Sequence, residues 1–262
     1  MSRLALTEIH EQAWFPKVMR DGLTDELQCA FKFGKVYEPI VPRLANALQA
    51  TGEHRIVDLC SGAGGPWTWL RQSLARELDS DRVEICLTDK FPNIAAFKRE
   101  KDVSGGALTY SSESVDASKI PPQLDGFRVL FTAFHHFSPD EAAAILQDAV
   151  DNRRGIGVFE AARRRPLSIF LTTIMLFVGF LIVPFIRPFR ASLLVWTYLI
   201  PVVPFVLWFD GVLSCLRAYP PEELSELVSR VTTQDYIWDI GEVQGLIAPV
   251  TYLVGYPAPL PR

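Results

Sequence analysis

Short hydrophobic runs alternate with longer amphipathic segments along most of the chain. Runs rich in β-branched and aromatic residues, bounded by turn residues, predict seven β-strands, at residues 55–60, 83–88, 107–110, 127–132, 155–159, 235–240 and 249–255. Apolar residues three or four positions apart predict helices, at residues 24–33, 37–50, 66–79, 92–101, 139–151 and 220–231. Because helices separate most of the first five strands, we expect a parallel sheet with right-handed crossovers. The last two strands are close enough in sequence for an antiparallel hairpin, so the pattern predicts an α/β fold.

One region departs from this alternation. Residues 167–186 (LSIFLTTIMLFVGFLIVPFI) and 191–209 (ASLLVWTYLIPVVPFVLWF) carry no charged side chain, and Arg187-Pro-Phe-Arg190 joins them. A helix of about 20 residues is about 30 Å long, enough to cross the hydrocarbon core of a bilayer. Strands of the predicted sheet precede and follow this region, so both of its outer ends should lie on the same side of a membrane. We therefore expect an antiparallel hairpin. Prolines at positions 184, 188, 201 and 204 favour a shallow or re-entrant hairpin over two regular spans. The alternative is an apolar lid buried on the rest of the protein.

Composition and charge narrow the class of protein. Hydrophobic residues make up 49% of the 262 residues and the formal charge is −4, which excludes a disordered chain and a globally basic nucleic-acid binder. The charge is uneven: residues 153–217 contain eight arginines and only two acidic residues. The run Arg163-Arg164-Arg165 before the apolar region and Arg217 after it suit the cytosolic face of an anionic membrane.

The cysteines and the first residues bear on localisation. Four cysteines lie far apart with no CxxC pair, which argues against a disulfide scaffold and fits a reducing compartment. Histidine, cysteine and carboxylate residues do not recur at metal-ligand spacing, so no metal site is predicted. The sequence MSRLALTEIHEQAW lacks the apolar core of a signal peptide. We therefore expect a protein on the cytosolic face of a membrane, or in the cytoplasm if the apolar region is a buried lid. Nothing in the sequence indicates the oligomeric state.

The segment DLCSGAGGP, which starts at Asp58, carries the strongest chemical signal. A strand ends there, glycines let the backbone approach a ligand closely, and the next helix offers free N–H groups. Two kinds of nucleotide ligand use such a turn. The dinucleotide fingerprint GxGxxG needs a third glycine where Trp67 stands, which disfavours a nicotinamide-dependent reductase. An acid four residues before Gly62 instead fits a ligand that bears an ammonium group.

At this point the sequence resembles the class I S-adenosylmethionine-dependent methyltransferases, from about residue 37 to residue 255, with the apolar region as an interruption. The resemblance implies a Rossmann-like, doubly wound seven-stranded sheet with a C-terminal antiparallel hairpin and an apolar helical insertion after strand five. It implies S-adenosyl-L-methionine as the cofactor. The segment VDLCSGAGGP matches the family's first motif, which places the methionine end of the cofactor at Asp58, Cys60, Ser61, Gly62 and Gly64.

Three further segments extend the resemblance. ICLTDKFPN places Asp89 at the ribose hydroxyls and Lys90 at the adenine edge, and SVDASKIP places Asp116 and Ala117 near the adenine. LFTAFHHF resembles the segment that faces the transfer site, with residues Phe134, His135 and His136. Plainer interpretations remain: Asp89 or Asp116 as a helix cap, Phe134 as a packing residue, and adjacent histidines whose side chains diverge, one of them buried. Glu160, at the tip of strand five, points into the site or pairs with Arg163.

These observations predict a domain organisation and a function. Residues 1–34 form an N-terminal helical cap, residues 35–165 and 211–262 form the methyltransferase core, and residues 166–210 form the hydrophobic insertion. The insertion leaves the chain beside the site, which favours a membrane-associated methyltransferase with a hydrophobic small-molecule or lipid-like acceptor. An oxygen acceptor would need a base, for which His135, His136 and Glu160 are candidates. The alternatives are a membrane-anchored cofactor-binding protein without catalysis and a nicotinamide-dependent reductase.

Overall fold

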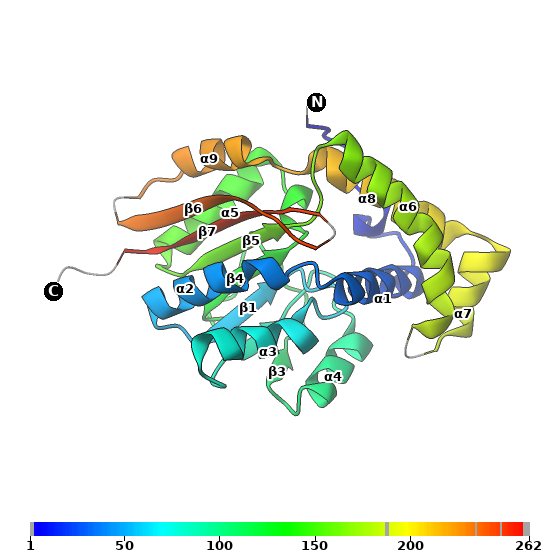
Figure 1. The fold of residues 1–262 in the computed structure, drawn as a ribbon, viewed down its shortest axis with the longest axis horizontal. Helices are drawn as coiled ribbons and strands as arrows, with labels where there is room; N and C mark the ends of the chain where they lie inside the picture. The colour runs from blue at the N-terminus through cyan, green and yellow to red at the C-terminus, as the bar shows by residue number, and fades with distance from the viewer. Residues whose placement is uncertain (1–2, 187–188, 234, 247, 259–262) are drawn as a thin grey trace.

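A seven-stranded sheet organises the computed structural model, which describes residues 3–186, 189–233, 235–246 and 248–258. The strand order is β3-β2-β1-β4-β5-β7-β6 (Figure 1). The strands are β1 (Arg55–Leu59), β2 (Glu84–Leu87), β3 (Leu108–Tyr110), β4 (Phe127–Phe131), β5 (Ile156–Glu160), β6 (Tyr236–Val243) and β7 (Val250–Pro257). The first five strands pair in parallel, and β7 pairs antiparallel with both β5 and β6. The predicted α/β fold, with its C-terminal antiparallel hairpin, is confirmed.

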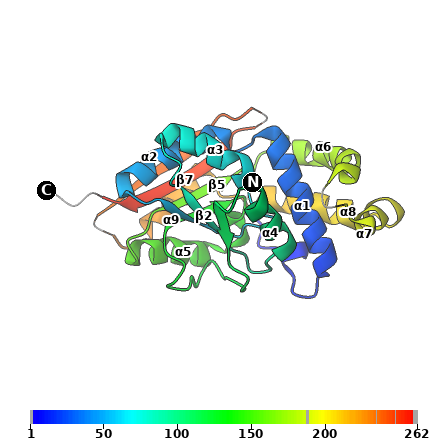
Figure 2. The ribbon, with the colours of Figure 1, turned by 90° about the horizontal axis from the view of Figure 1, so that it is seen from below.

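Helices cover both faces of the sheet (Figure 2). One face packs against α2 (Val41–Thr51), α3 (Trp67–Leu78) and α4 (Ile94–Val103), the other against α5 (Pro139–Asp151) and α9 (Pro221–Ser229). Each helix buries one apolar stripe: Leu44 and Leu48 of α2, one turn apart, are buried. These two cores hold the carboxyl ends of the parallel strands at one edge.

The N-terminal segment lies across this edge. Residues 3–16 form a 3₁₀ turn at Ile9–Glu11 and a further turn at residues 12–15, and α1 follows (Lys17–Gly34). The Arg3 guanidinium donates hydrogen bonds to the carbonyl oxygens of His135 (3.0 Å) and Phe137 (2.7 Å). The predicted helix at residues 24–33 is the second half of the longer helix α1. Residues 3–16, which precede α1, form a strap across the edge of the sheet.

The apolar region projects from the same edge as a pair of helical arms (Figure 1). The first arm is α6 (Pro166–Ile182) with a 3₁₀ turn (Val183–Phe185). The second is α7 (Ala191–Leu194), a π-helical turn (Val195–Leu199) and α8 (Val202–Arg217). Helices α6 and α8 pack against each other, and residues from both arms join Phe15 and Leu23 in a small core. At the tip, Arg190 pairs with Asp25 of α1 at 3.0 Å, while Arg187 and Pro188 lie outside the described residues.

The outer side of α6 is apolar and exposed. Leu167, Phe170, Phe177, Leu181 and Phe185 are all at least 60% exposed. By length and hydropathy one helix, Pro166–Phe185, could cross a membrane, and the bent pair Ala191–Leu199 and Val202–Arg217 passes the same test together. Only 11% of the apolar stretch within the helix Pro166–Phe185 is buried. Most of α6 therefore does not form the buried lid of the alternative interpretation.

Candidate functional site

A cavity of about 890 Å³ lies at the carboxyl edge of the sheet. Its walls come from the glycine turn after β1, the end of β2, the turn after β4, the N-terminal strap, α1, α6 and α8. Polar residues of the sheet edge form one part of the wall, and apolar residues of the two arms form another, including Leu171, Met175, Leu207 and Trp208. The turn and the insertion singled out in the sequence therefore share one cavity.

Asp58 lies next to the last residue of β1, lines the cavity and is only 1% exposed. Its Oδ2 accepts a hydrogen bond of 2.9 Å from the Trp67 indole N–H, while its Oδ1 is buried without a hydrogen-bond partner among the described residues. Burial raises the pKa of Asp58 to about 7, against the effect of the Trp67 hydrogen bond. A buried acceptor without a partner is costly, and a cationic donor in the cavity would satisfy it. Trp67 thus has a role in the first motif that the sequence did not reveal.

The turn after β1 needs left-handed backbone conformations. Cys60, Gly62 and Gly64 have φ values of 62°, 57° and 114°. Cys60, Ser61 and Gly62 line the cavity, as expected, but Gly64 does not. A Cβ at Gly64 would lie 2.6 Å from Glu100 Cγ, so this glycine permits packing against α4 rather than approach to a ligand. Its predicted place at the cofactor stays a prediction.

Asp89 follows the end of β2 and lines the cavity, half-buried. Its Oδ2 accepts a hydrogen bond from the Gly62 backbone N–H and its Oδ1 accepts one from the Phe91 N–H, both at 2.8 Å. Asp89 does not cap the following helix, because that cap is Asn93. Lys90 is exposed beside it and pairs with Asp116 at 3.8 Å.

Besides Gly64, three of the predicted cofactor residues lie outside the cavity wall. Asp116 binds the Ser118 backbone N–H (2.9 Å) and hydroxyl (2.7 Å), which makes a local turn. Ala117 and Phe134 are buried in the core beneath α5 and α9, where Phe134 packs beside Tyr219. Phe134 thus packs in the core, and Asp116 holds a local turn rather than capping a helix as its plainer interpretation had it. The predicted contacts of the three residues with the cofactor stay predictions.

Glu160 and His135 form a buried pair at the cavity, which His135 lines and Glu160 does not. Glu160 Oε1 accepts hydrogen bonds from the backbone N–H groups of Phe134 (2.7 Å) and His135 (3.3 Å), and its Oε2 lies 2.8 Å from His135 Nδ1. Burial alone would lower the pKa of His135, but the Glu160 and Glu8 carboxylates raise it to about 10. The His135 imidazolium has no free lone pair, and the Glu160 carboxylate faces His135 and the backbone of the turn after β4. This geometry favours a positioning role for the pair, while a role of either residue as the base stays a prediction. Arg163 binds Glu242 instead of Glu160.

The two histidines do not diverge as the sequence suggested. Their ring centroids are 4.2 Å apart, because the 3₁₀ turn at Phe134–His136 brings both side chains under the strap. His136 lines the cavity and its Nδ1 lies 2.7 Å from Glu11 Oε1. His135 Nε2 lies 3.4 Å from Glu8 Oε1.

The strap adds charged residues to the cavity wall that the sequence did not mark as site residues. Glu8 is 1% exposed and accepts a hydrogen bond of 2.9 Å from the Ser214 hydroxyl of α8. Asp210 of α8 accepts hydrogen bonds from the backbone N–H groups of Ile9 (2.8 Å) and His10 (3.0 Å). Arg217 pairs with Glu11 at 3.2 Å. These partners are about 200 residues apart, so no local pattern marks the cluster; the two acids flanking His10 were its only visible sign.

The basic run before the insertion is paired within the protein. Arg163 and Arg165 both pair with Glu242 of β6, at 2.7 and 3.2 Å, and Arg164 pairs with Glu223 of α9 at 2.7 Å. These ion pairs fasten the start of α6 to the core. The run is therefore engaged in ion pairs, although the Arg165 side chain is 60% exposed, and its contact with an anionic membrane stays a prediction.

The comparisons with known proteins concern the fold. No family model matches the sequence, and no curated protein matches it either. The O-methyltransferase NcsB1 from neocarzinostatin biosynthesis, solved with S-adenosyl-L-homocysteine and 1,4-dihydroxy-2-naphthoic acid, is 15% identical with a TM-score of 0.56, over 96% of this chain and 62% of NcsB1. Human N-acetylserotonin methyltransferase, solved with S-adenosylmethionine, is 15% identical with a TM-score of 0.52, over 93% of this chain and 57% of the enzyme. The pyocyanin biosynthetic protein PhzM is 13% identical with a TM-score of 0.50, over 87% and 56%.

The chain thus spans about three-fifths of the length of these proteins. At such low identity the likeness concerns the arrangement of helices and strands. The fold is that of the class I methyltransferases, with the α6–α8 arms beside the cavity.

Proposed function

We propose that this protein is an S-adenosylmethionine-dependent methyltransferase that methylates a hydroxyl group of an apolar small molecule at a membrane surface. The observation that carries the proposal is the shared cavity, in which Asp58 and Asp89 of the sheet edge and the apolar residues of α6 and α8 face one space.

The residues at the sheet edge fit the cofactor. Asp58 Oδ1 is a buried acceptor that lacks a partner among the described residues and suits the ammonium group. Each carboxylate oxygen of Asp89 already accepts one backbone hydrogen bond and retains a lone pair for the ribose hydroxyls. The backbone at Cys60–Gly62 lines the cavity between these two acids. The cofactor, when bound, supplies a methyl group activated by its sulfonium.

The acceptor side of the cavity combines apolar walls with proton acceptors. Leu171, Met175 and Leu207 exclude water and contribute to the binding of an apolar acceptor, at about 0.8 kcal/mol for each buried methylene. His136 and Glu11 line the same cavity, which supports an acceptor whose hydroxyl proton must be removed. The naphthoic acid in the structure of NcsB1 is a bicyclic hydroxylated compound of this chemical type.

The exposed stripe of α6 supports the membrane part of the proposal. Leu167, Phe170, Phe177 and Leu181 are spaced three, seven and four residues apart and so share one face of the helix. The ion pair between Arg190 and Asp25 holds the tip against α1. This arrangement favours arms that lie in the cytosolic interface over arms that span the bilayer, and an acceptor dissolved in the membrane would reach the cavity along α6.

The test is calorimetry with S-adenosylmethionine, followed by a turnover assay for S-adenosylhomocysteine with 1,4-dihydroxy-2-naphthoic acid and with a lipid extract. We expect binding of S-adenosylmethionine but not of NADH, and turnover that depends on an apolar acceptor. Binding of NADH alone would favour a reductase. Cofactor binding without turnover on either acceptor source would favour a binding protein without catalysis.

A further inference from the structure

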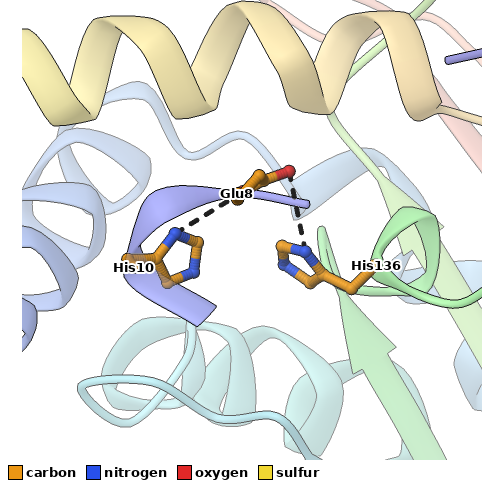
Figure 3. Close-up of side chains that lie close together, drawn as sticks. All are labelled: Glu8, His10 and His136. Carbon is orange, nitrogen blue, oxygen red and sulfur yellow. Dashed lines mark ion pairs between the residues drawn. The ribbon is translucent and has the colours of Figure 1, made fainter. Parts of the chain in front are cut away.

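We infer that Glu8, His10 and His136 form a binding site for a divalent transition-metal ion at the acceptor side of the cavity. One ring nitrogen from each histidine and one carboxylate oxygen of Glu8 lie within 4.8 Å of one another (Figure 3). The sequence predicted no metal site, because Glu8 and His10 are far from His136 along the chain and form no metal-ligand spacing with it. This group joins two residues of the strap to one residue of the turn after β4.

The distances within the group suit shared coordination better than hydrogen bonding. Glu8 Oε2 is 3.5 Å from His10 Nδ1, and Glu8 Oε1 is 3.6 Å from His136 Nδ1. Both distances exceed the usual N–H···O range of about 2.7–3.2 Å. Two ligand atoms that each lie about 2.1 Å from one ion are separated by about 3.0–3.5 Å. The carboxylate between the two imidazoles is therefore already close to the spacing that an ion would impose.

A second carboxylate accompanies each histidine. Asp210 Oδ2 lies 2.9 Å from His10 Nδ1, and Glu11 Oε1 lies 2.7 Å from His136 Nδ1. Asp210 is itself fixed by the backbone N–H groups of Ile9 and His10. These are the same nitrogens that face Glu8, so an ion bound there would replace any proton on them. Asp210 and Glu11 would then lie within reach of the ion as further carboxylate ligands.

The charge around the group leaves room for a dication. Three carboxylates face the two histidines, and Arg217 is the arginine that lies beside them among the described residues. The three carboxylates are Glu8, Glu11 and Asp210. A divalent ion between them would supply the positive charge that these acids attract. Glu8 is nearly fully buried, so this compensation has to come from close by.

The donor set indicates the kind of ion. Two imidazole nitrogens and one carboxylate are the ligands of catalytic zinc and of non-haem iron(II), whereas Mg²⁺ and Ca²⁺ prefer oxygen alone. All three residues line the cavity, so the open coordination positions face the space assigned to the acceptor. This inference rests on the proposed function in one respect: an acceptor hydroxyl bound to the ion would lose its proton more readily.

The test measures metal binding on the full chain after dialysis against a chelator. We expect one Zn²⁺ per chain by calorimetry and elemental analysis, and a Co²⁺-substituted protein with the visible absorption of a low-symmetry, nitrogen-ligated site. Glu8→Gln and His10→Ala should each lose equimolar zinc. His54→Ala is the matched control, because His54 is an exposed histidine outside the proposed site, and this variant should bind zinc as the wild type does.

Circular dichroism and S-adenosylmethionine calorimetry without metal show whether each variant is folded, and they separate the two proposals. A wild-type protein that binds the cofactor but takes up no stoichiometric zinc overturns the metal inference and leaves the proposed function intact. Zinc uptake that is unchanged in folded Glu8→Gln and His10→Ala also overturns it. Zinc uptake without cofactor binding supports the metal site and contradicts the proposed function.

Discussion

The Asp89 carboxylate accepts a hydrogen bond of 2.8 Å from the backbone N–H of Gly62. This contact joins the end of β2 to the glycine turn after β1. The sequence assigned the first segment to the ribose of the cofactor and the second to its methionine end. Because Asp89 also binds the Phe91 N–H, its orientation is set by the fold before any ligand arrives. A preorganised acceptor of this kind loses little entropy on binding.

Replacement of Asp89 by Ala should weaken the binding of S-adenosylmethionine. The variant loses charged acceptors for the ribose hydroxyls, which we expect to cost about 1.5–3 kcal/mol, or about 10- to 150-fold in Kd. Calorimetry measures the change. Asp89→Asn, which keeps one acceptor oxygen, should lie between the two. Asp102→Ala is the control, since Asp102 is exposed on α4, outside the cavity wall. Unchanged affinity in Asp89→Ala would refute the placement of the cofactor.

Glu160→Gln should destabilise the protein by about 3–5 kcal/mol, because it leaves the buried His135 imidazolium without its closest counter-charge. The pH dependence carries the signature. Since the pKa of His135 is raised from 6.5 to about 10, the stability from this group is complete below pH 6.5 and is lost as the pH rises through 10. Urea unfolding across this range should show a shallower decline in the variant than in the wild type. Equal slopes would mean that Glu160 does not hold the proton on His135.

The sequence predicted the sheet well and the acceptor side of the site poorly, for one physical reason. Strands such as β1 and β4 are short, mostly apolar and mostly buried, so their signal lies within a few residues. The charge cluster under the strap depends on pairs such as Glu8 with Ser214, which only the tertiary structure brings together. The same limit hid the ion pairs of the arginine run, since the acids that pair with it follow about 60 to 80 residues later.

Glu26→Gln should stabilise the protein at alkaline pH relative to the wild type. Glu26 faces Gly179 of α6, where a Cβ would overlap its carboxylate, and its Oε2 has no hydrogen-bond partner among the described residues. Burial raises its pKa from 4.5 to about 7, so the stability that the protonated form provides is complete below pH 4.5 and is lost as the pH rises through 7. The advantage of the variant should grow across that range by about 3 kcal/mol, measured by urea unfolding. Exposed Glu77→Gln should show no such trend.

The outer stripe of α6 can be tested without disturbing the core. Phe170, Phe177 and Leu181 are 60%, 65% and 72% exposed, so their replacement removes little packing within the protein. Deletion of the whole insertion would be less informative, because Leu193 and Val203 pack against Phe15 and its neighbours in the small core beside α1.

The triple variant Phe170→Ser, Phe177→Ser, Leu181→Ser should lose binding to phosphatidylcholine vesicles in a flotation assay. Each of these side chains contributes about 1.5–3 kcal/mol when it is transferred fully from water to an apolar phase, so the three together should lower partitioning by at least about 100-fold. Because the arginines before α6 are already paired, binding of the wild type should persist in high salt and need no anionic lipid. Val103→Ser is the control, since Val103 is 68% exposed on α4 and should not contact the bilayer. If the triple variant floats as the wild type does, or if the wild type remains in the bottom fraction, the stripe is not a membrane contact.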